Sequence, residues 1–165
     1  MRSAWTGLSD AQLLQQCLVD TYRASGPGGQ KRNKTSSAVR LRHVPSGLLL
    51  IAEESRSQHE NKARALKRLR QRLHLRLRET FAADVAVEAV KPHGLKVSVR
   101  DERFWPTVGF VLDALEAHTG RVSETAAVLG VSTGRLNDFL RLDDKVWEEA
   151  NQIRQRFGQK PLRDS

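Results

Sequence analysis

The chain has 165 residues, of which 39% are apolar, and carries a formal net charge of +9 with a pI near 10.4. This composition is enough for a packed core, and the length allows one domain or two small ones. It contains no run of about 18 apolar residues that could span a membrane and no secretory signal. The single cysteine has no metal-ligand spacing around it, so we expect a cytoplasmic protein without disulfide, metal site or cofactor.

The positive charge is concentrated in the first half of the chain. Residues 1–80 contain 16 of the 28 Lys and Arg residues but only 6 of the 19 Asp and Glu residues. This asymmetry points to an N-terminal unit that binds a polyanion, joined to a C-terminal unit without excess charge. Alternatively, the excess positive charge only keeps the protein in solution.

The first elements are a short helix, a strand and a loop. Ser9 and Gln12 form a capping box that predicts a helix over about residues 10–16, and residues 17–23 are typical of a strand. Residues 24–37 contain three glycines and no large apolar side chain. They therefore predict an exposed loop.

A hairpin and a long helix follow. Residues 39–43 alternate between apolar and basic side chains, as a half-buried strand does. A type I turn is predicted over 44–47, followed by a returning strand at 48–52. A second capping box then begins a long basic helix whose apolar stripe consists of Leu66, Leu69, Leu73 and Leu77.

The pattern changes after about residue 83. Residues 85–99 alternate loosely and predict a possible β-hairpin, and helical patterning resumes at Pro106. Residues 126–140 resemble a helix-turn-helix, in which a glycine permits the turn and a serine caps the second helix. A final helix has Trp147, Ala150, Ile153 and Phe157 on one stripe. We therefore expect an α+β fold with two domains, residues 1–83 and 84–165, the second mainly helical.

Three interpretations of the glycine-rich loop compete. It is a passive surface loop, a nucleotide-phosphate cradle, or a loop that enters a crowded RNA site. The cradle is disfavoured because Asn33 stands where a P-loop needs glycine, and because a strand rather than a helix follows. In the third interpretation adjacent glycines permit close approach to another backbone. Gln30, which cannot act as a base, donates to a developing oxyanion and positions water.

Four blocks of this sequence, at residues 23–30, 33–35, 37–41 and 55–62, resemble the catalytic domain of class I peptide chain release factors. The resemblance covers about residues 17–78. It implies a compact α+β domain whose loop enters the peptidyl transferase centre of the large ribosomal subunit and promotes hydrolysis of peptidyl-tRNA. No cofactor is implied.

The resemblance also assigns residues. The family's catalytic Gly-Gly-Gln maps onto Gly28, Gly29 and Gln30, and the family's N5-methylation makes Gln30 a candidate for that modification. Many relatives have His-Val after the glutamine, whereas this chain has Lys31 and Arg32, which add positive charge beside the loop and should strengthen phosphate contact.

We expect the remaining basic and polar residues of these blocks to contact ribosomal RNA or the tRNA acceptor end. Asn33 could instead cap the loop internally, and His59 has no partner at metal-ligand spacing. The expected RNA-binding residues are Arg23, Ser25, Lys31, Arg32, Asn33, Lys34, Arg56, Gln58, His59, Asn61, Lys62, Arg64 and Arg68. The other basic residues of the long helix, which form either an RNA-backbone surface or a solvated face, are Lys67, Arg70, Arg72, Arg76 and Arg78.

Release factors also carry large domains that read stop codons, and about 16 residues before the first strand leave no room for them here. The chain therefore resembles the short rescue proteins, which free peptides from stalled ribosomes without reading a codon. The expected partners are the ribosome, peptidyl-tRNA and a possible recognition partner of the C-terminal domain, but neither a membrane nor DNA. A non-catalytic RNA-binding or regulatory protein with a helix-turn-helix-like module is the alternative function.

Overall fold

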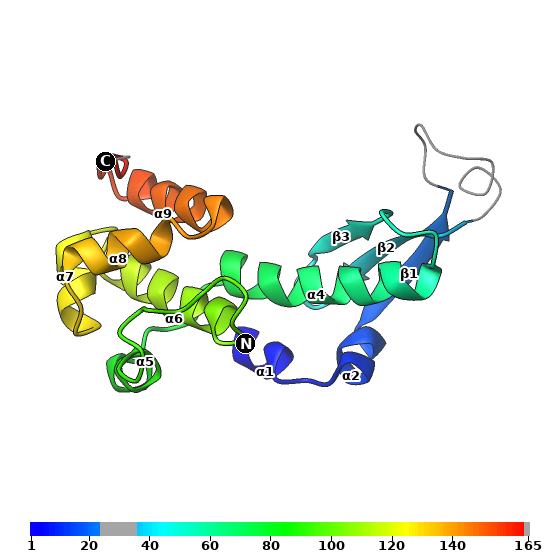
Figure 1. Ribbon diagram of the computed structural model, residues 1–165, viewed down its shortest axis with the longest axis horizontal. Helices are drawn as coiled ribbons and strands as arrows, with labels where there is room; N and C mark the ends of the chain where they lie inside the picture. Colours follow the sequence, from blue (N-terminus) through cyan, green and yellow to red (C-terminus); the bar gives the residue numbers. More distant parts are fainter. Residues whose placement is uncertain (24–35, 164–165) are drawn as a thin grey trace. The chain divides into compact units, whose positions relative to one another are not determined.

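The computed structural model describes residues 1–23 and 36–163 (Figure 1). The chain divides into two compact units, Met1–Leu73 and His74–Ser165. The described residues form a small antiparallel sheet and a larger number of helices, which confirms the expected α+β class. The boundary between the units lies inside the long helix, earlier than residue 83, because Leu75 already belongs to the core of the second unit.

The first unit begins with two short helices and continues into the sheet. The Ser9 hydroxyl accepts a hydrogen bond from the Gln12 N–H while the Gln12 side chain accepts from the Ser9 N–H, so the predicted capping box is confirmed. Helix α1 was not predicted. The elements of this unit are α1 (Arg2–Thr6), α2 (Asp10–Gln15), β1 (Cys17–Tyr22), β2 (Ala38–His43), β3 (Leu49–Ala52) and most of α4 (Gln58–Arg76).

The sheet has the order β1-β2-β3, with both pairs antiparallel. Val39, Leu41 and Leu50 are buried on one face, and α4 runs beside the sheet in Figure 1 with its own buried leucines completing this core. The pair Tyr22–Ala38 closes one end of the β1–β2 ladder. The loop predicted to be functional therefore leaves and re-enters the sheet at this end.

The opposite end of the sheet carries the turn between β2 and β3. The Gly47 N–H donates to the carbonyl of His43 at 2.8 Å, and Gly47 has φ +73°. The turn is thus one residue wider than the predicted type I turn, and it needs the left-handed conformation that glycine adopts without strain. The buried His43 ring bonds Ser46 Oγ at 2.7 Å and Gln16 Oε1 at 3.0 Å.

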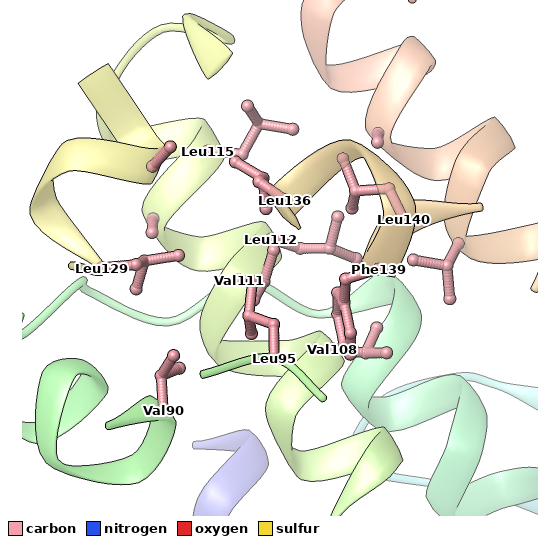
Figure 2. Packing of buried hydrophobic residues seen from close by; sticks show 14 of the residues in the cluster. Val90, Leu95, Val108, Val111, Leu112, Leu115, Leu129, Leu136, Phe139 and Leu140 are labelled. Carbon is pink, nitrogen blue, oxygen red and sulfur yellow. The ribbon is translucent and has the colours of Figure 1, made fainter. Parts of the chain in front are cut away.

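The second unit is helical throughout its described elements. They are α5 (Ala83–Val90), α6 (Phe104–Ala117), α7 (Val122–Val128), α8 (Thr133–Leu140) and α9 (Asp144–Arg156). Figure 2 shows the core, in which Val108, Leu112 and Leu115 of α6 lie among Leu136 and Phe139 of α8. No helix among the described residues is long and apolar enough to cross a membrane.

The possible hairpin at 85–99 is wrong, because residues 83–90 form α5. Ala86 and Val90, four residues apart, are buried, whereas Val85 is 53% exposed. This is the spacing of one helix face and not the alternation of a strand. Residues 91–95 do form turns, in which Gly94 and Leu95 have positive φ.

The helix-turn-helix geometry is present in α7 and α8. Gly130 has φ +70° in the turn, and the Ser132 hydroxyl accepts from the Arg135 N–H at 3.1 Å, as the sequence predicted. In α9, Ala150 and Ile153 are buried as expected, but Phe157 lies beyond the helix and is 40% exposed.

Candidate functional site

The structure describes both ends of the predicted catalytic loop and not the loop itself. Gly28, Gly29 and Gln30 lie outside the described residues, as do Ser25 and the stretch Lys31–Lys34. What the structure shows is the frame from which this segment extends: Tyr22 and Arg23 on the outgoing side, and Ser36 and Ser37 on the returning side.

The outgoing end is held by Tyr22, the last residue of β1. Its hydroxyl donates to Glu53 Oε2 at 3.2 Å, just after the end of β3. The guanidinium of Arg40 lies 5.8 Å from the ring centroid. Burial and the neighbouring Glu53 carboxylate raise the pKa of Tyr22, so this phenol remains protonated and serves as a hydrogen-bond donor. Arg23, the next residue, is exposed.

The returning end is held by two amide side chains from the first turn of α4. Gln58 Nε2 donates to the carbonyl of Ser36 at 3.1 Å, and Asn61 Nδ2 donates to the carbonyl of Ser37 at 2.8 Å. Asn61 is fully buried, whereas Gln58 is exposed. The expected RNA contact of Asn61 is therefore wrong: its side chain is inside the protein and is occupied by backbone groups.

The start of α4 has a modified cap. The Ser57 hydroxyl accepts from the Glu60 N–H at 3.3 Å, as in the predicted capping box. The Glu60 carboxylate does not close the box, because it accepts from the Ser55 hydroxyl at 2.5 Å instead. The Ser55 hydroxyl in turn accepts from the Ser57 N–H at 3.0 Å. These bonds hold residues 53–61 in a defined path against both ends of the loop.

Two arginines of α4 serve the fold of the first unit. Arg70 donates to the carbonyls of Thr6 and Leu8 at 2.9 and 2.7 Å and pairs with Asp10 at 2.8 Å, which pins the N-terminal segment. Arg68 pairs with Glu54 and donates to the carbonyl of Ile51. Arg70 is thus structural, and Arg68 is already neutralised by an acid.

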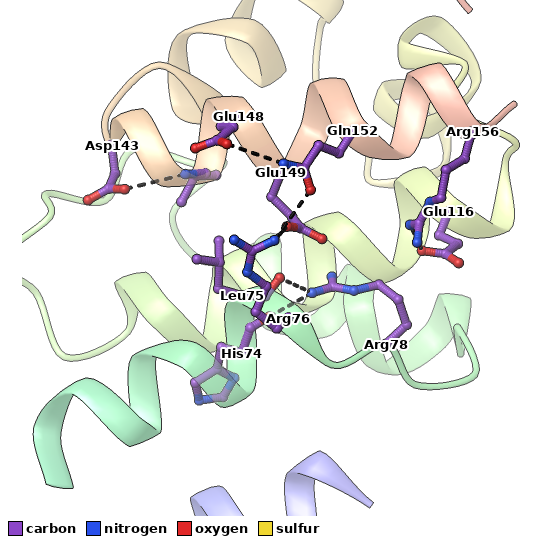
Figure 3. A network of polar contacts seen from close by, with 11 residues as sticks. His74, Leu75, Arg76, Arg78, Glu116, Asp143, Glu148, Glu149, Gln152 and Arg156 are labelled. Carbon is purple, nitrogen blue, oxygen red and sulfur yellow. Dashed lines mark hydrogen bonds and ion pairs between the residues drawn. The ribbon is translucent and has the colours of Figure 1, made fainter. Parts of the chain in front are cut away.

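The last two arginines of the expected RNA surface are structural in the second unit (Figure 3). Arg76 pairs with Glu149 of α9 at 2.8 Å, and the Glu149 side chain is only 8% exposed. Arg78 pairs with Asp113 of α6 at 3.6 Å, with 14% and 5% of the two side chains exposed. An RNA-backbone role for Arg76 and Arg78 is therefore wrong.

Apart from Arg23 and from Arg42 on β2, the cations left for a polyanion in the first unit lie near the start and along the outside of α4. They are Arg56, Lys62, Arg64, Lys67 and Arg72, and they pair with no acid among residues 1–23 and 36–163. His59 is exposed beside them. Met1–Leu73 contains 14 Lys and Arg residues against 5 Asp and Glu residues. Three of these acids, Asp10, Asp20 and Glu54, are already paired with arginine.

In its described part, this arrangement offers exposed cations and holds the residues on either side of the loop segment. Within residues 1–23 and 36–163, no three His, Cys, Asp or Glu side chains are placed to hold a metal ion. Arg56 and Lys62 lie next to the α4 N-terminus, where the helix dipole also favours negative charge. Tyr22 and Glu53 were missed by sequence reasoning, because no local pattern pairs residues so far apart.

Comparison with known proteins identifies the family of a stretch that includes most of the first unit and the start of the second. A family model described as the RF-1 domain matches residues 14–102, more than half of the chain and more than the four motif blocks cover. The chain is 62% identical over 55 residues to peptide chain release factor 1 of Solidesulfovibrio magneticus, covering 33% of this chain and 15% of that protein. It is 51% identical over 77 residues to peptide chain release factor 2 of Paramagnetospirillum magneticum, covering 46% and 21%. The match thus spans about a fifth, or less, of the length of these relatives.

Proposed function

This chain belongs to the RF-1 domain family, and we propose on that basis that it acts in the release of peptides from the ribosome by hydrolysing the ester bond of peptidyl-tRNA. The observation that carries the proposal is the family match across residues 14–102, which contain the Gly28-Gly29-Gln30 sequence and the frame around it. The proposed partners are the RNA of the large ribosomal subunit and peptidyl-tRNA.

In this proposal Gln30 does not transfer a proton, since an amide does not titrate at any useful pH. Its backbone N–H donates to the oxygen on which negative charge develops, and its side chain positions the attacking water. Gly28 and Gly29 allow the backbone to approach the RNA closely. Arg56, Lys62 and Arg64, with the loop cations, bind phosphates at the docking surface. N5-methylation of Gln30 would be detected by mass spectrometry of the native protein.

We also propose that this release does not depend on the codon in the A site, as on a stalled ribosome. Release at a stop codon alone is the outcome that would contradict it.

The helix-turn-helix geometry of α7 and α8 supports a second role for residues 84–165 as a recognition module. His74–Ser165 contains 14 Lys and Arg residues and 14 Asp and Glu residues. A unit without net charge gains little from an RNA backbone. We therefore propose that it binds a recognition partner. The alternative for the whole chain is a non-catalytic RNA-binding or regulatory protein.

One experiment separates the hypotheses. Ribosomes carrying labelled formylmethionyl-tRNA in the P site are prepared with an empty A site, with a sense codon and with a stop codon, and release of the label is measured. The unmodified chain should release with the A site empty. Gln30→Ala keeps the backbone N–H but loses the side chain that positions the water, so it should release about 100-fold more slowly, the cost of a misplaced reactant, while still binding ribosomes. Equal activity of the two proteins would exclude a catalytic role of the Gln30 side chain, and no release in any complex would exclude the enzymatic function.

A further inference from the structure

Residues 53–61, the connection from β3 and the first turn of α4, contact both ends of the loop segment. Glu53 accepts the Tyr22 hydroxyl at 3.2 Å on the outgoing side. Gln58 and Asn61 bind the carbonyls of Ser36 and Ser37 on the returning side. We propose that residues 53–61 form a bracket that sets the position of the loop, with Asn61 as its central positioning residue. This inference rests on the proposed function.

The hydrogen bonds of Asn61 leave it one orientation. Oδ1 accepts from the Ser55 N–H at 3.0 Å, and Nδ2 donates to the carbonyls of Ser37 and Ser55, both at 2.8 Å. Both protons of the amide nitrogen are therefore used, and rotating the amide by 180° would turn its oxygen toward two carbonyl oxygens. Since Asn61 is fully buried, its direct hydrogen bonds connect the bracket to Ser37 and are not exchanged for bonds to water.

The bond to Ser37 acts next to the point where the loop joins β2. Ser37 is buried and directly precedes Ala38, whose partner in the sheet is Tyr22. A shift of the Ser37 backbone therefore moves the returning end of the segment that carries Gln30. A catalytic group that works by position alone is sensitive to such shifts, and a displacement of about 1 Å can lower the rate by about 100-fold.

Asn61→Asp is the sharpest test, because the two side chains have the same shape. The variant keeps the acceptor for the Ser55 N–H but has no donor for Ser37 or Ser55. We expect kcat for release to fall by about 100-fold while the KM for ribosomes stays within about twofold, since the phosphate-binding cations are untouched. Gln58→Ala, at an exposed position where folding is not at risk, should lower kcat by about two- to tenfold, the range set by one hydrogen bond.

The matched control is Ser46→Ala, which removes hydrogen bonds to His43 and from the Leu48 N–H at the opposite end of the same sheet. It should leave kcat unchanged. Amide hydrogen exchange supplies a readout that needs no activity. Asn61→Asp should accelerate exchange at Tyr22 and Ala38, and Ser46→Ala at His43.

The outcomes are distinct. A wild-type kcat in Asn61→Asp and Gln58→Ala, or unchanged exchange at Ala38, would overturn the bracket. An equal loss of kcat in Ser46→Ala would show a general effect of weakening the sheet and would overturn it too. No release by the unmodified chain would refute the proposed function instead, and exchange at Ala38 would still decide whether Asn61 holds this end of the loop.

Discussion

The pair formed by Arg78 and Asp113 offers a direct test of the division of arginines between structure and RNA binding. Replacing Arg78 by methionine keeps much of the side-chain length and removes the charge. Asp113, whose side chain is 5% exposed, would then remain as a buried carboxylate without its cation. Arg78 also donates to the carbonyls of His74 and Leu75 at the end of α4, and these bonds would be lost as well.

The size of the effect follows from this burial. Breaking a buried ion pair by removing one partner costs about 3–5 kcal/mol. Asp113 would keep the hydrogen bond from the Glu79 N–H at 3.1 Å, which places the loss from the pair near the lower limit. We therefore expect Arg78→Met to lower the free energy of unfolding of the second unit by about 3 kcal/mol.

Urea unfolding followed by the fluorescence of Trp105 and Trp147, both in the second unit, measures this loss. The double variant Arg78→Met with Asp113→Asn should recover most of it, because an amide can still accept from Glu79 and needs no cation. Ribosome affinity measured well below the unfolding transition should not change. A loss of less than about 1 kcal/mol, well under the range for a buried pair, or a double variant no more stable than the single one, would refute the structural assignment of Arg78.

Two further predictions concern the first unit. Burial lowers the pKa of His43, so the unfolded chain binds a proton more readily than the folded one. The stability due to neutral His43 is therefore full above the unfolded pKa near 6.5 and is lost as the pH falls toward the folded pKa. Unfolding followed between pH 7.5 and 5.5 by Trp5, whose ring lies 5.0 Å from His43, should show this decline, and a similar decline in His43→Gln would contradict it. Arg64→Ala and Lys67→Ala should each weaken ribosome binding and reduce its salt dependence by about one ion. Gln71→Ala should not, and unchanged salt slopes in all three variants would contradict RNA contact.

Features set by short stretches of sequence could be predicted before the structure. The Ser9 capping box, the strands around the loop, the long helix and the Gly130 turn all follow from patterns within a few residues. The exceptions are α1, which no pattern indicated, and α5, where the loose alternation over residues 85–99 suggested a hairpin. A short apolar stretch fits both the two-residue period of a strand and the 3.6-residue period of a helix. Only tertiary packing, here of Ala86 and Val90, decides between them.

Partners distant in sequence could not be predicted. The sequence shows that α4 is basic, but not that Arg70 binds the N-terminal segment or that Arg76 and Arg78 bind acids of α9 and α6. Asn61 was singled out with the motif as an RNA contact, because a local pattern does not distinguish a buried amide from an exposed one. The structure leaves a smaller set of cations without an acidic partner among the described residues, from Arg56 before α4 to Arg72 within it.

The bracket at residues 53–61 also has a thermodynamic consequence for residues 24–35. Because both ends of this segment are tied to one short stretch of chain, the strand pairing between Tyr22 and Ala38 does not depend on which residues lie between them. The entropy lost on closing a loop grows only with the logarithm of its length, about 0.6 kcal/mol for each doubling. Insertions and substitutions in residues 24–35 should therefore lower the free energy of unfolding little. Selection on this segment then acts on its function more than on the stability of the fold.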